Sequence, residues 1–528
     1  MKFKLSSLVL VAVTAVLFLG TADAAEPTPL EWRPCDDGSD ALCGDLIYCQ
    51  DDIHYGYHVP GDESSKCGEL PGPLLRLQRN QTYKMVLHNH AGNNTNLHTH
   101  GLHVVGSGDG DDVFRVAGPG ECLNYTWDIP ADHPPGTHWY HPHYHTLTTD
   151  QFKGGAIGMI IVEDDDPNLP EWAYDELLLQ ISQPAGQYKL MYGNGLAQEE
   201  TFNIMGDKWY RLRVSVATPN GKLSTLWFEE GGCLFYKVAS DGIWHNAPFG
   251  TYQGISWGMT GASRADFAIK CSPGSNNTVN WENGIVAFIN VGESAGDMSS
   301  VPPGQAPAKP ASMMDLYTAE VPAANKWNIT LIGGTMFGHP YTYNRTISGY
   351  RWYPEPPSAM ATIAWNQAHE YNFRYSIFHP YHIHMYHVLI VQEGGCGDFI
   401  EGEFYDTVAA HTDCLVRFFT ADFGQKMIMH CHDLPHEDAG MMAWMDVEGE
   451  GMPRNLEDGS SYMCPEGFTP PTSSGSGSAP ASSPTAPGTE SAPAAAPGDD
   501  EDSAAGSRFV YGVTVVMAAV VMAVTTAW

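Results

Sequence analysis

Basic residues are scarce in this sequence. Of its 528 residues, 26 are Lys or Arg and 61 are Asp or Glu, so the formal net charge is −35 with the histidines neutral. A surface of that sign repels nucleic acid and attracts cations, including metal ions and cationic organic molecules. We therefore expect no nucleic-acid partner, although charge alone does not identify a chemistry.

Long amphipathic helices are also missing. Short apolar runs between Gly and Pro turns, such as residues 158–163 and 284–291, are typical of strands and predict a mostly β structure. Residues 26–465 leave room for two or three domains. The proline-rich segment 302–310 indicates a stiff linker, and a weaker boundary is expected near 164–170.

The two ends of the sequence differ from its body. Residues 1–24 combine early lysines, an apolar stretch and a small-residue site, which indicates a signal peptide and export. Residues 466–508 consist mainly of Pro, Ala, Ser, Gly and acids and predict a disordered stalk. Residues 509–528 are apolar with no basic residue after them, which favours a GPI-anchor signal over a retained transmembrane helix. We expect a secreted protein tethered to the extracellular face of the plasma membrane, with both kinds of tether open.

The cysteine count is odd. Eleven cysteines in an exported chain indicate disulfides and one thiol left over. Cys431 is the candidate for the free thiol because His430 and His432 flank it. The other ten could form five bridges, for which Cys396–Cys414 and Cys233–Cys271 are plausible pairs. Six Asn-x-Ser/Thr triplets support passage through a glycosylating route, at Asn80, Asn93, Asn124, Asn276, Asn328 and Asn344.

Histidine is concentrated in four clusters, two near the start of the folded region and two near its end. Their patterns are His98-x-His100, His138-x2-His141-x-His143-x-His145, His379-x2-His382-x-His384, and His430-Cys-His432 followed by His436 and Met441. Side chains at i and i+2 of a strand leave on one face, so a His-x-His pair can reach a shared metal ion. A single pair is weak evidence, because zinc sites, cupin-type sites and surface histidines share it.

The last two clusters predict two separate metal sites. By parity, one face can carry His382, His384, His430 and His432, whereas His379 and Cys431 point to the other. His436 and Met441 follow within reach of Cys431. Two histidines, a cysteine thiolate and a weak axial methionine form the blue-copper electron-transfer site. One strand could therefore hold a mononuclear copper on one side and a copper cluster on the other.

At these residues the sequence resembles the multicopper oxidases. His430-Cys-His-x3-His-x4-Met441 is similar to the final motif of cuprous oxidases and laccase-like enzymes, and the other three clusters match the remaining motifs in order. The resemblance implies an all-β fold of three cupredoxin-like Greek-key β-sandwich domains, at 25–165, 166–301 and 311–465. The middle domain matches only loosely.

The resemblance also implies four copper ions and a role for each ligand. The type 1 copper would be bound by His379, Cys431 and His436, with Met441 axial. The type 2 copper would be bound by His98 and His382. The type 3 pair would be held by His100, His141, His143, His384, His430 and His432. We expect His103, His138, His145 and His387, beside the motifs, to be structural.

The implied reaction is the four-electron reduction of O2 to water, with Cys431 in the electron route. Glu437, Asp109 and Asp112 are candidate proton donors by similarity to the family, with solvated loop carboxylates as the equal alternative. A laccase-like oxidase of phenols and aromatic amines is the first choice. A metallo-oxidase of Fe(II), Cu(I) or Mn(II) is the second, favoured by the negative charge, the membrane tether and Met427, Met429, Met442 and Met445. A non-catalytic surface protein that retains the fold is the third.

Overall fold

A computed structural model describes most of the chain's body: residues 29–61, 67, 71–183, 191–192, 199–229, 231–282, 284–313, 316–332, 335–340, 358–374, 379–391, 396–409, 413–452 and 460–465. All of these residues belong to one compact unit. The expected signal peptide, stalk and hydrophobic tail, and Asn344, lie outside the described ranges. Within them, no helix has the length and apolar character needed to cross a membrane.

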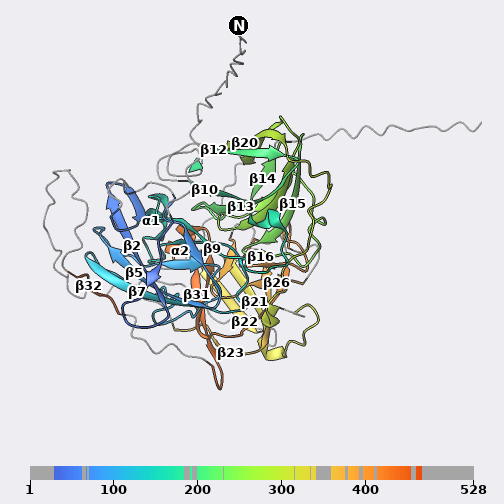
Figure 1. The fold of residues 1–528 in the computed structure, drawn as a ribbon. Helices are drawn as coiled ribbons and strands as arrows, with labels where there is room; N and C mark the ends of the chain where they lie inside the picture. The colour runs from blue at the N-terminus through green and yellow to red at the C-terminus, as the bar shows by residue number, and fades with distance from the viewer. Residues whose placement is uncertain are drawn as a thin grey trace, which may run out of the picture. The chain divides into compact units, whose positions relative to one another are not determined.

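Six β-sheets pair into three sandwiches, drawn in Figure 1 from blue through green to orange along the chain. Each sheet contains one parallel strand pair within the described residues, and its other pairs are antiparallel. The same mixed pattern is thus used three times. The predicted all-β class of three cupredoxin-like Greek-key sandwiches is confirmed.

The first sandwich encloses a core that includes Leu46, Tyr83 and Ile160. Its larger sheet has the order β1-β2-β5-β7-β32, with β3 on β2, and the facing sheet is β4-β9-β8-β6. The strands are β1 (Arg33–Pro34), β2 (Leu42–Asp51), β3 (His54–His58), β4 (Leu75–Leu77), β5 (Gln81–Asn89), β6 (His98–His100), β7 (Glu121–Ile129), β8 (Gly136–His141), β9 (Gly158–Val162) and β32 (Tyr462–Met463).

The middle sandwich encloses a core around Leu212, Phe267 and Ile289. Its sheets have the orders β11-β10-β13-β18-β15-β16 and β12-β20-β19-β14-β17. The strands are β10 (Glu176–Ser182), β11 (Met191–Tyr192), β12 (Glu200–Gly206), β13 (Trp209–Ala217), β14 (Ser224–Phe228), β15 (Cys233–Ser240), β16 (Ile243–Trp244), β17 (Ser256–Met259), β18 (Arg264–Cys271), β19 (Asn276–Trp281) and β20 (Gly284–Ser294).

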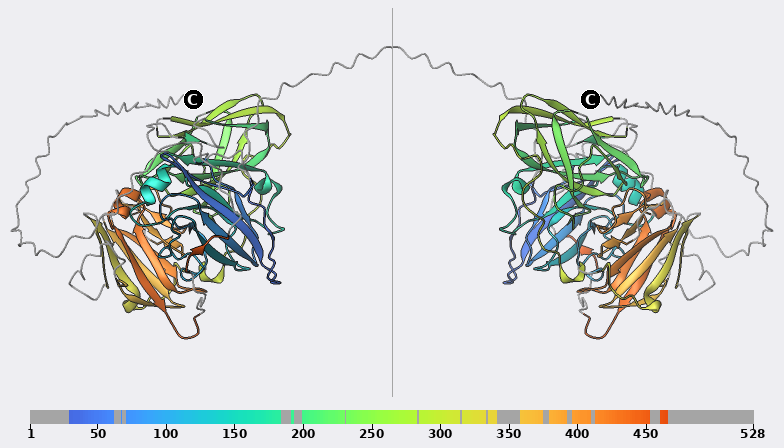
Figure 2. Two further views of the ribbon diagram at one scale, coloured as in Figure 1. Left: turned by 90° about the vertical axis from the view of Figure 1, so that its left-hand side faces the viewer. Right: turned by 90° about the vertical axis from the view of Figure 1, so that its right-hand side faces the viewer.

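The last sandwich encloses a core around Tyr371, Val416 and Met429. Its sheets have the orders β22-β21-β24-β29-β26-β27 and β23-β31-β30-β25-β28, and Figure 2 shows these strands from two sides in yellow to orange. The strands are β21 (Lys326–Ile332), β22 (Thr335–Pro340), β23 (Thr362–Ala364), β24 (Ala368–Arg374), β25 (Tyr381–Ile383), β26 (Val388–Ile390), β27 (Phe404–Tyr405), β28 (Thr407–Val408), β29 (Cys414–Phe419), β30 (Gln425–Cys431) and β31 (Met442–Glu448).

Helices are few and short in the described residues. Two α-helices, α1 (Thr148–Lys153) and α2 (Leu434–Asp438), contact each other. They follow β8 and β30, two of the strands that contain histidines of the sequence motifs. Single 3₁₀ turns occur at Glu171–Tyr174, Ala311–Met313 and Ala323–Asn325. The two α-helices thus lie beside the strands that carry the sequence motifs.

The disulfides agree with the cysteine analysis. Five bridges form and Cys431 remains free, as predicted, and the two suggested pairs, Cys233–Cys271 and Cys396–Cys414, are both present. The remaining bridges are Cys35–Cys43, Cys49–Cys67 and Cys122–Cys464. The last of these joins β7 to the segment of β32. That segment therefore belongs to the first sandwich's sheet, although it falls within the range 311–465 expected for the third domain.

Candidate metal centre

Four short strands carry the histidine motifs. In the first sandwich, His98 on β6 lies opposite His141 on β8, and in the last sandwich His382 on β25 lies opposite His430 on β30. Alternation along each strand sends side chains two residues apart to the same face. The two strand pairs meet, because His98 Nε2 lies 3.4 Å from His382 Nε2.

Eight histidines gather where these strands meet. We call this set the histidine cluster; each member is at most 1% exposed, and the members are His98, His100, His141, His143, His382, His384, His430 and His432. Their ring nitrogens form three groups with spacings within 4.8 Å, namely His98, His100, His382; His100, His141, His432; and His143, His384, His430. Every member is one of the eight histidines predicted for the type 2 and type 3 copper sites.

The outward hydrogen bonds of the rings fix which nitrogen faces inward. His98 Nδ1 lies 2.7 Å from Asp111 Oδ2, and His382 Nδ1 lies 2.9 Å from the backbone oxygen of Asp406. These oxygens only accept hydrogen bonds, so the Nδ1 atom of each ring must donate. In a neutral ring the Nε2 atom then has no proton, and its lone pair points into the cluster. Two lone pairs facing each other at 3.4 Å require a cation between them or a proton on one.

The same argument applies to the rest of the cluster. His430 Nδ1 donates to the Cys431 oxygen at 3.0 Å, so its Nε2 is bare, yet the Nε2 atoms of both His143 and His384 lie within 3.2 Å of it. Buried ring nitrogens without a hydrogen-bond partner include His100 Nδ1, His141 Nε2 and both nitrogens of His432. Buried polar groups normally find partners, so these converging donor atoms fit metal ions. Imidazole suits copper among other metals.

Burial favours the neutral form of most imidazoles in the cluster. It lowers the pKa of His141 and of His430 to about 3, and it lowers that of His382 far below the usual value, with the neighbouring imidazoles adding to the effect. Neutral imidazole is the form that binds metal. The electrostatics therefore suit a cation binding site.

A second group lies on the opposite side of β30. Cys431 Sγ is 3.6 Å from His379 Nδ1 and 3.8 Å from His436 Nδ1, and the two Nδ1 atoms are 3.2 Å apart. We call these three residues the Cys431 cluster. The Cys431 backbone N–H donates to the Met441 oxygen at 3.0 Å, which holds the buried Met441 next to the group. Two imidazole nitrogens, one thiolate and a nearby thioether fit the donor set of a blue-copper site.

The Cys431 cluster differs in exposure from the histidine cluster. Cys431 is fully buried, whereas the His436 side chain is 40% exposed. Burial raises the pKa of the Cys431 thiol well above its usual range, so without a cation the sulfur keeps its proton. His379 and His436 are therefore the members of this cluster that are partly open to solvent.

The acids near the histidine cluster differ in part from those expected. Asp111, which sequence analysis missed, hydrogen-bonds His98 and accepts from the Thr99 backbone N–H at 2.8 Å. Asp112 instead pairs with Lys426 Nζ at 2.7 Å, and Asp109 accepts a backbone bond from Thr126 at its carbonyl. The run of nearby aspartates was the only available signal, and it could not distinguish among them.

Glu437 lies beside the other end of the cluster. It is fully buried, and its carboxylate oxygens lie 3.2 Å from His430 Nδ1 and 3.5 Å from His143 Nδ1. Neither oxygen has a hydrogen-bond partner. Helix α2 positions it, since Glu437 follows His436 in that helix.

Asp406, in the last sandwich, contacts a histidine of the cluster. Asp406 Oδ1 lies 3.1 Å from His100 Nε2 and accepts from Arg264 Nη1 at 2.8 Å. Asp241, from the middle sandwich, accepts from the Asp406 backbone N–H at 3.0 Å. The loosely matched middle region therefore supplies residues that fix the orientation of His100.

The four histidines expected to be structural lie outside the four groups above. His103 contacts Asp422 at 2.9 Å, and His387 Nε2 donates to the Asp241 carbonyl at 2.8 Å. His138 is fully buried and His145 is partly exposed.

Comparison with known proteins identifies two matched regions. Family models described as "Multicopper oxidase" match residues 33–167 and 344–450, which contain β6, β8, β25 and β30. The middle sandwich lies between the two matches.

Curated relatives match over limited lengths. The iron transport multicopper oxidase FET3 of Kluyveromyces lactis is 29% identical over 203 residues, covering 34% of this chain and 30% of the relative. The laccase ustL of Ustilaginoidea virens is 33% identical over 91 residues, covering 16% and 14%. The chain thus matches less than a third of the length of either relative.

Solved structures match over most of the fold. A multicopper oxidase from Campylobacter jejuni, described as a metallo-oxidase, aligns with a TM-score of 0.61 at 18% identity, covering 81% of this chain and 95% of that one. At this identity the likeness establishes the fold.

Proposed function

The chain belongs to the multicopper oxidase family, and we propose that it is an oxidase that takes electrons singly from a reducing substrate and reduces O2 to water. The observation that carries this proposal is the position of Cys431. Its sulfur lies in one donor cluster, while its covalent neighbours His430 and His432 lie in the other. The two groups are therefore joined by the shortest possible stretch of backbone.

Four copper ions would occupy these sites. His379, Cys431 and His436, with Met441, would hold the type 1 ion, and His98 with His382 the type 2 ion. One type 3 ion would be held by His100, His141 and His432, and the other by His143, His384 and His430. Bound copper would supply the one-electron chemistry and the place where O2 is reduced.

The protein's own part includes proton supply. Reducing one O2 to two waters consumes four electrons and four protons. Asp111 and Glu437 are buried carboxylates in contact with the histidine cluster, and the third such carboxylate, Asp406, is already paired with Arg264. We propose that Asp111 and Glu437 each take up a proton at a carboxylate oxygen during turnover and pass it to the cluster. Asp112 is a weaker candidate because its carboxylate pairs with Lys426.

A test of this part uses Asp111→Asn and Glu437→Gln, which keep size but cannot cycle a proton. Each should lower kcat by about 10²-fold or more, with copper content unchanged. Asp112→Asn is the matched control in the same loop. Equal rates for Asp111→Asn and Asp112→Asn would remove Asp111 from the proposal.

We favour a laccase-like activity on phenols and aromatic amines. The partly exposed His436 edge offers an electron entry to small organic donors, and one relative is named a laccase. A metallo-oxidase is the second candidate, favoured by the net charge of −35 and by Asp433, whose carboxylate lies 3.5 Å from His436 Nδ1. One relative is named an iron transport oxidase.

Two measurements test the function. Cys431→Ser should abolish the blue absorption and reduce oxidase activity by more than about 10³-fold, while Met427→Leu on the same strand should retain both. Activity that survives Cys431→Ser would overturn the electron route. Turnover of a neutral diphenol against ferrous and cuprous ions then separates the candidates, and a strong preference for either metal ion would overturn the laccase-like assignment.

We also propose that the protein is exported and tethered at the cell surface. Five disulfides suit an oxidising compartment, and the five described glycosylation triplets have at least partly exposed asparagines. Glycosidase should shift the protein's mass. Release from membranes by a phosphatidylinositol-specific phospholipase would indicate a GPI anchor, and retention would indicate a transmembrane helix.

A further inference from the structure

Asp45, His88 and Cys122 lie in a row across three neighbouring strands of the first sandwich. Within β5 and β7, Leu87 and Leu123 turn to the core, so alternation sends His88 and Cys122 to the opposite, outer face. His88 and Cys122 are direct cross-strand partners. The three side chains belong to none of the copper-binding groups described above.

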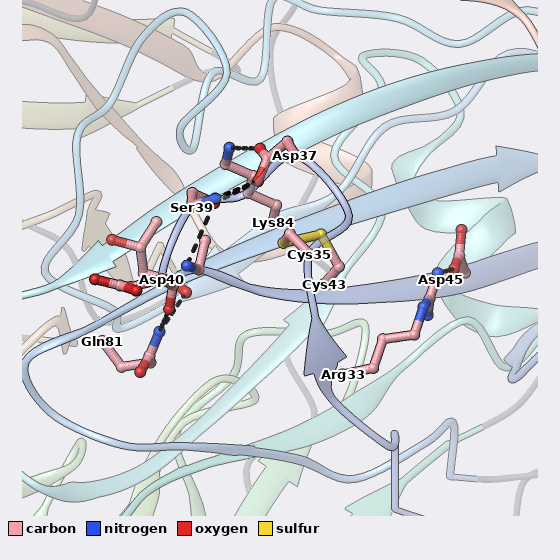
Figure 3. Close-up of a disulfide and its surroundings, with 11 residues drawn as sticks. Arg33, Cys35, Asp37, Ser39, Asp40, Cys43, Asp45, Gln81 and Lys84 are labelled. Carbon is pink, nitrogen blue, oxygen red and sulfur yellow. Dashed lines mark hydrogen bonds and ion pairs between the residues drawn. A yellow bond between two sulfur atoms is a disulfide. The ribbon is translucent and has the colours of Figure 1, made fainter.

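Their contacts form a connected chain. His88 Nε2 lies 2.8 Å from Asp45 Oδ1, and His88 Nδ1 lies 3.2 Å from Cys122 Sγ. Asp45 also accepts from Arg33 Nη2 at 2.6 Å, and Figure 3 shows Arg33 reaching Asp45 next to the Cys35–Cys43 bridge. The carboxylate is thus anchored on one side and oriented toward the imidazole on the other.

The charge on Asp45 sets the role of the imidazole. Burial raises the pKa of the Asp45 carboxyl, but the hydrogen bonds from His88 and Arg33 have the larger effect. The pKa of Asp45 therefore lies below its usual value. Since an ionised carboxylate only accepts, His88 Nε2 donates to it. His88 Nδ1, 3.2 Å from the Cys122 sulfur, is then the ring atom from which a proton could pass to that sulfur, while Nε2 stays bonded to the carboxylate.

Cys122 is one half of an unequally exposed disulfide. Its partner Cys464 lies 342 residues away in sequence and is partly exposed, whereas Cys122 is fully buried. Besides the bridge, the contacts of the Cys464 segment include the two-residue strand β32, the backbone bond from Cys464 to Gly120, and side-chain bonds from Ser461 to Glu121 and from Tyr462 to Asn124. Cys464 is therefore the more accessible half of this bridge.

We propose that Cys122–Cys464 is a site of thiol–disulfide exchange with low-molecular-weight thiols, assisted by the Asp45–His88 pair. The thiolate of the small molecule attacks Cys464 Sγ and forms a new S–S bond there, while the Cys464–Cys122 bond breaks. The electron pair leaves with Cys122 as a thiolate, which the protonated His88 neutralises. No other oxidant or reductant is consumed, because one disulfide replaces another.

The physical basis is the leaving group. Exchange is faster when the departing thiol has a lower pKa. A neighbouring histidinium lowers a cysteine pKa from about 8.5 to between about 3.5 and 7.5. This activity goes beyond the proposed oxidase function and needs no copper. Its result would be to release residues 460–465, and the chain that follows them, from the covalent link to the first sandwich.

The other disulfides of the chain supply an internal control. Cys233–Cys271 also joins a partly exposed cysteine to a buried one, and neither sulfur has a hydrogen bond within the described part of the chain. The full-length, copper-loaded protein would be incubated with reduced glutathione without oxygen, so that the coppers cannot consume the thiol. Alkylation and peptide mass spectrometry then give the opening rate of each bridge and the location of glutathione.

We expect Cys122–Cys464 to open at least about 10-fold faster than Cys233–Cys271, with glutathione on Cys464 and a free thiol at Cys122. His88→Gln should slow the opening of Cys122–Cys464 about 10-fold and leave Cys233–Cys271 unchanged, and Asp45→Asn should act in the same direction. His90→Gln, whose ring lies 6.3 Å from that of His88, is the matched control.

Equal rates for the wild type and His88→Gln would overturn the proposal, as would glutathione on Cys122. If His88→Gln does not fold, the wild-type rates and the position of the adduct still decide. The outcome is independent of the oxidase function, because exchange is measured with no turnover of O2.

Discussion

Two buried polar clusters in this protein differ in whether their polar atoms have hydrogen-bond partners. The histidine cluster joins the first and last sandwiches through converging ring nitrogens that lack partners. A second cluster, which we call the arginine cluster, joins the first and middle sandwiches and consists of Thr137, Asp164, Glu176, Arg211, Arg213 and Asp266. Both are almost completely buried, yet only one contains donor atoms that point at each other.

The two guanidinium groups of the arginine cluster are paired with acceptors inside the cluster. Arg211 Nε and Nη2 donate to Asp266 at 2.9 and 2.6 Å, and its Nη1 pairs with Asp164. Arg213 Nε donates to Glu176 at 2.7 Å and its Nη1 to Thr137 at 3.0 Å. Every guanidinium nitrogen thus finds an acceptor, which is the usual condition for burying a charge. Such a network is complete without a ligand.

This difference distinguishes a buried polar site that only stabilises the fold from one that binds a ligand. A satisfied network explains its own burial, whereas unsatisfied and converging donors indicate a missing binding partner. The comparison makes a strong prediction: metal removal should affect one cluster and leave the other intact.

Stripping copper with a chelator tests this directly and should have the largest effect. A ligand that binds the folded state at about 1,000 times its Kd contributes about 4 kcal/mol to the free energy of unfolding, and several ions contribute more. We expect the melting temperature to fall and hydrogen exchange to accelerate in β25 and β30, with β13 and β18 unchanged. Uniform acceleration across all four strands would contradict the separation of the clusters.

Disrupting the arginine cluster should lower the stability of the protein and leave its copper content unchanged. Asp266→Asn removes the charge that faces Arg211 Nε and Nη2, and leaving a buried charge without its partner costs about 3–5 kcal/mol. We expect the urea midpoint to fall while the copper content per folded chain stays the same. Asp175→Asn, which removes a half-exposed partner of Lys208, is the control and should cost less than about 1 kcal/mol. Loss of copper in Asp266→Asn would show that the clusters are coupled.

Local periodicity predicted more of this molecule than any long-range feature. The alternation along a strand correctly separated His430 and His432 from Cys431, because the side-chain period of a strand is two. In contrast, Asp406 contacts His100 across 306 residues, and Cys122 pairs with Cys464 across 342. No pattern within a strand encodes such contacts, since they depend on how the sandwiches pack. Asp111 lies between the two predicted candidates, Asp109 and Asp112, but residues outside a strand follow no such period, so sequence alone could not choose it.

His369 sharpens the comparison, because it is a buried histidine that belongs to neither cluster. It is fully buried, its Nε2 donates to the Ala364 oxygen at 2.9 Å, and burial lowers its pKa to about 4 from an ordinary value of 6.5. Between these two pH values the unfolded chain binds a proton that the folded protein does not. His369 therefore contributes stability that is present above pH 6.5 and is lost as the pH falls toward 4.

His369→Gln should remove this pH dependence. At about 1.4 kcal/mol per pKa unit, the wild type should lose roughly 3 kcal/mol more than the variant between pH 7 and pH 4, measured by urea unfolding. His54→Gln, at an exposed site, should lose as much as the wild type. Because the copper ligands are the same in all three proteins, their acid response cancels in the differences. Parallel curves for the wild type and His369→Gln would contradict the assignment of this part of the acid sensitivity to burial of the His369 imidazole.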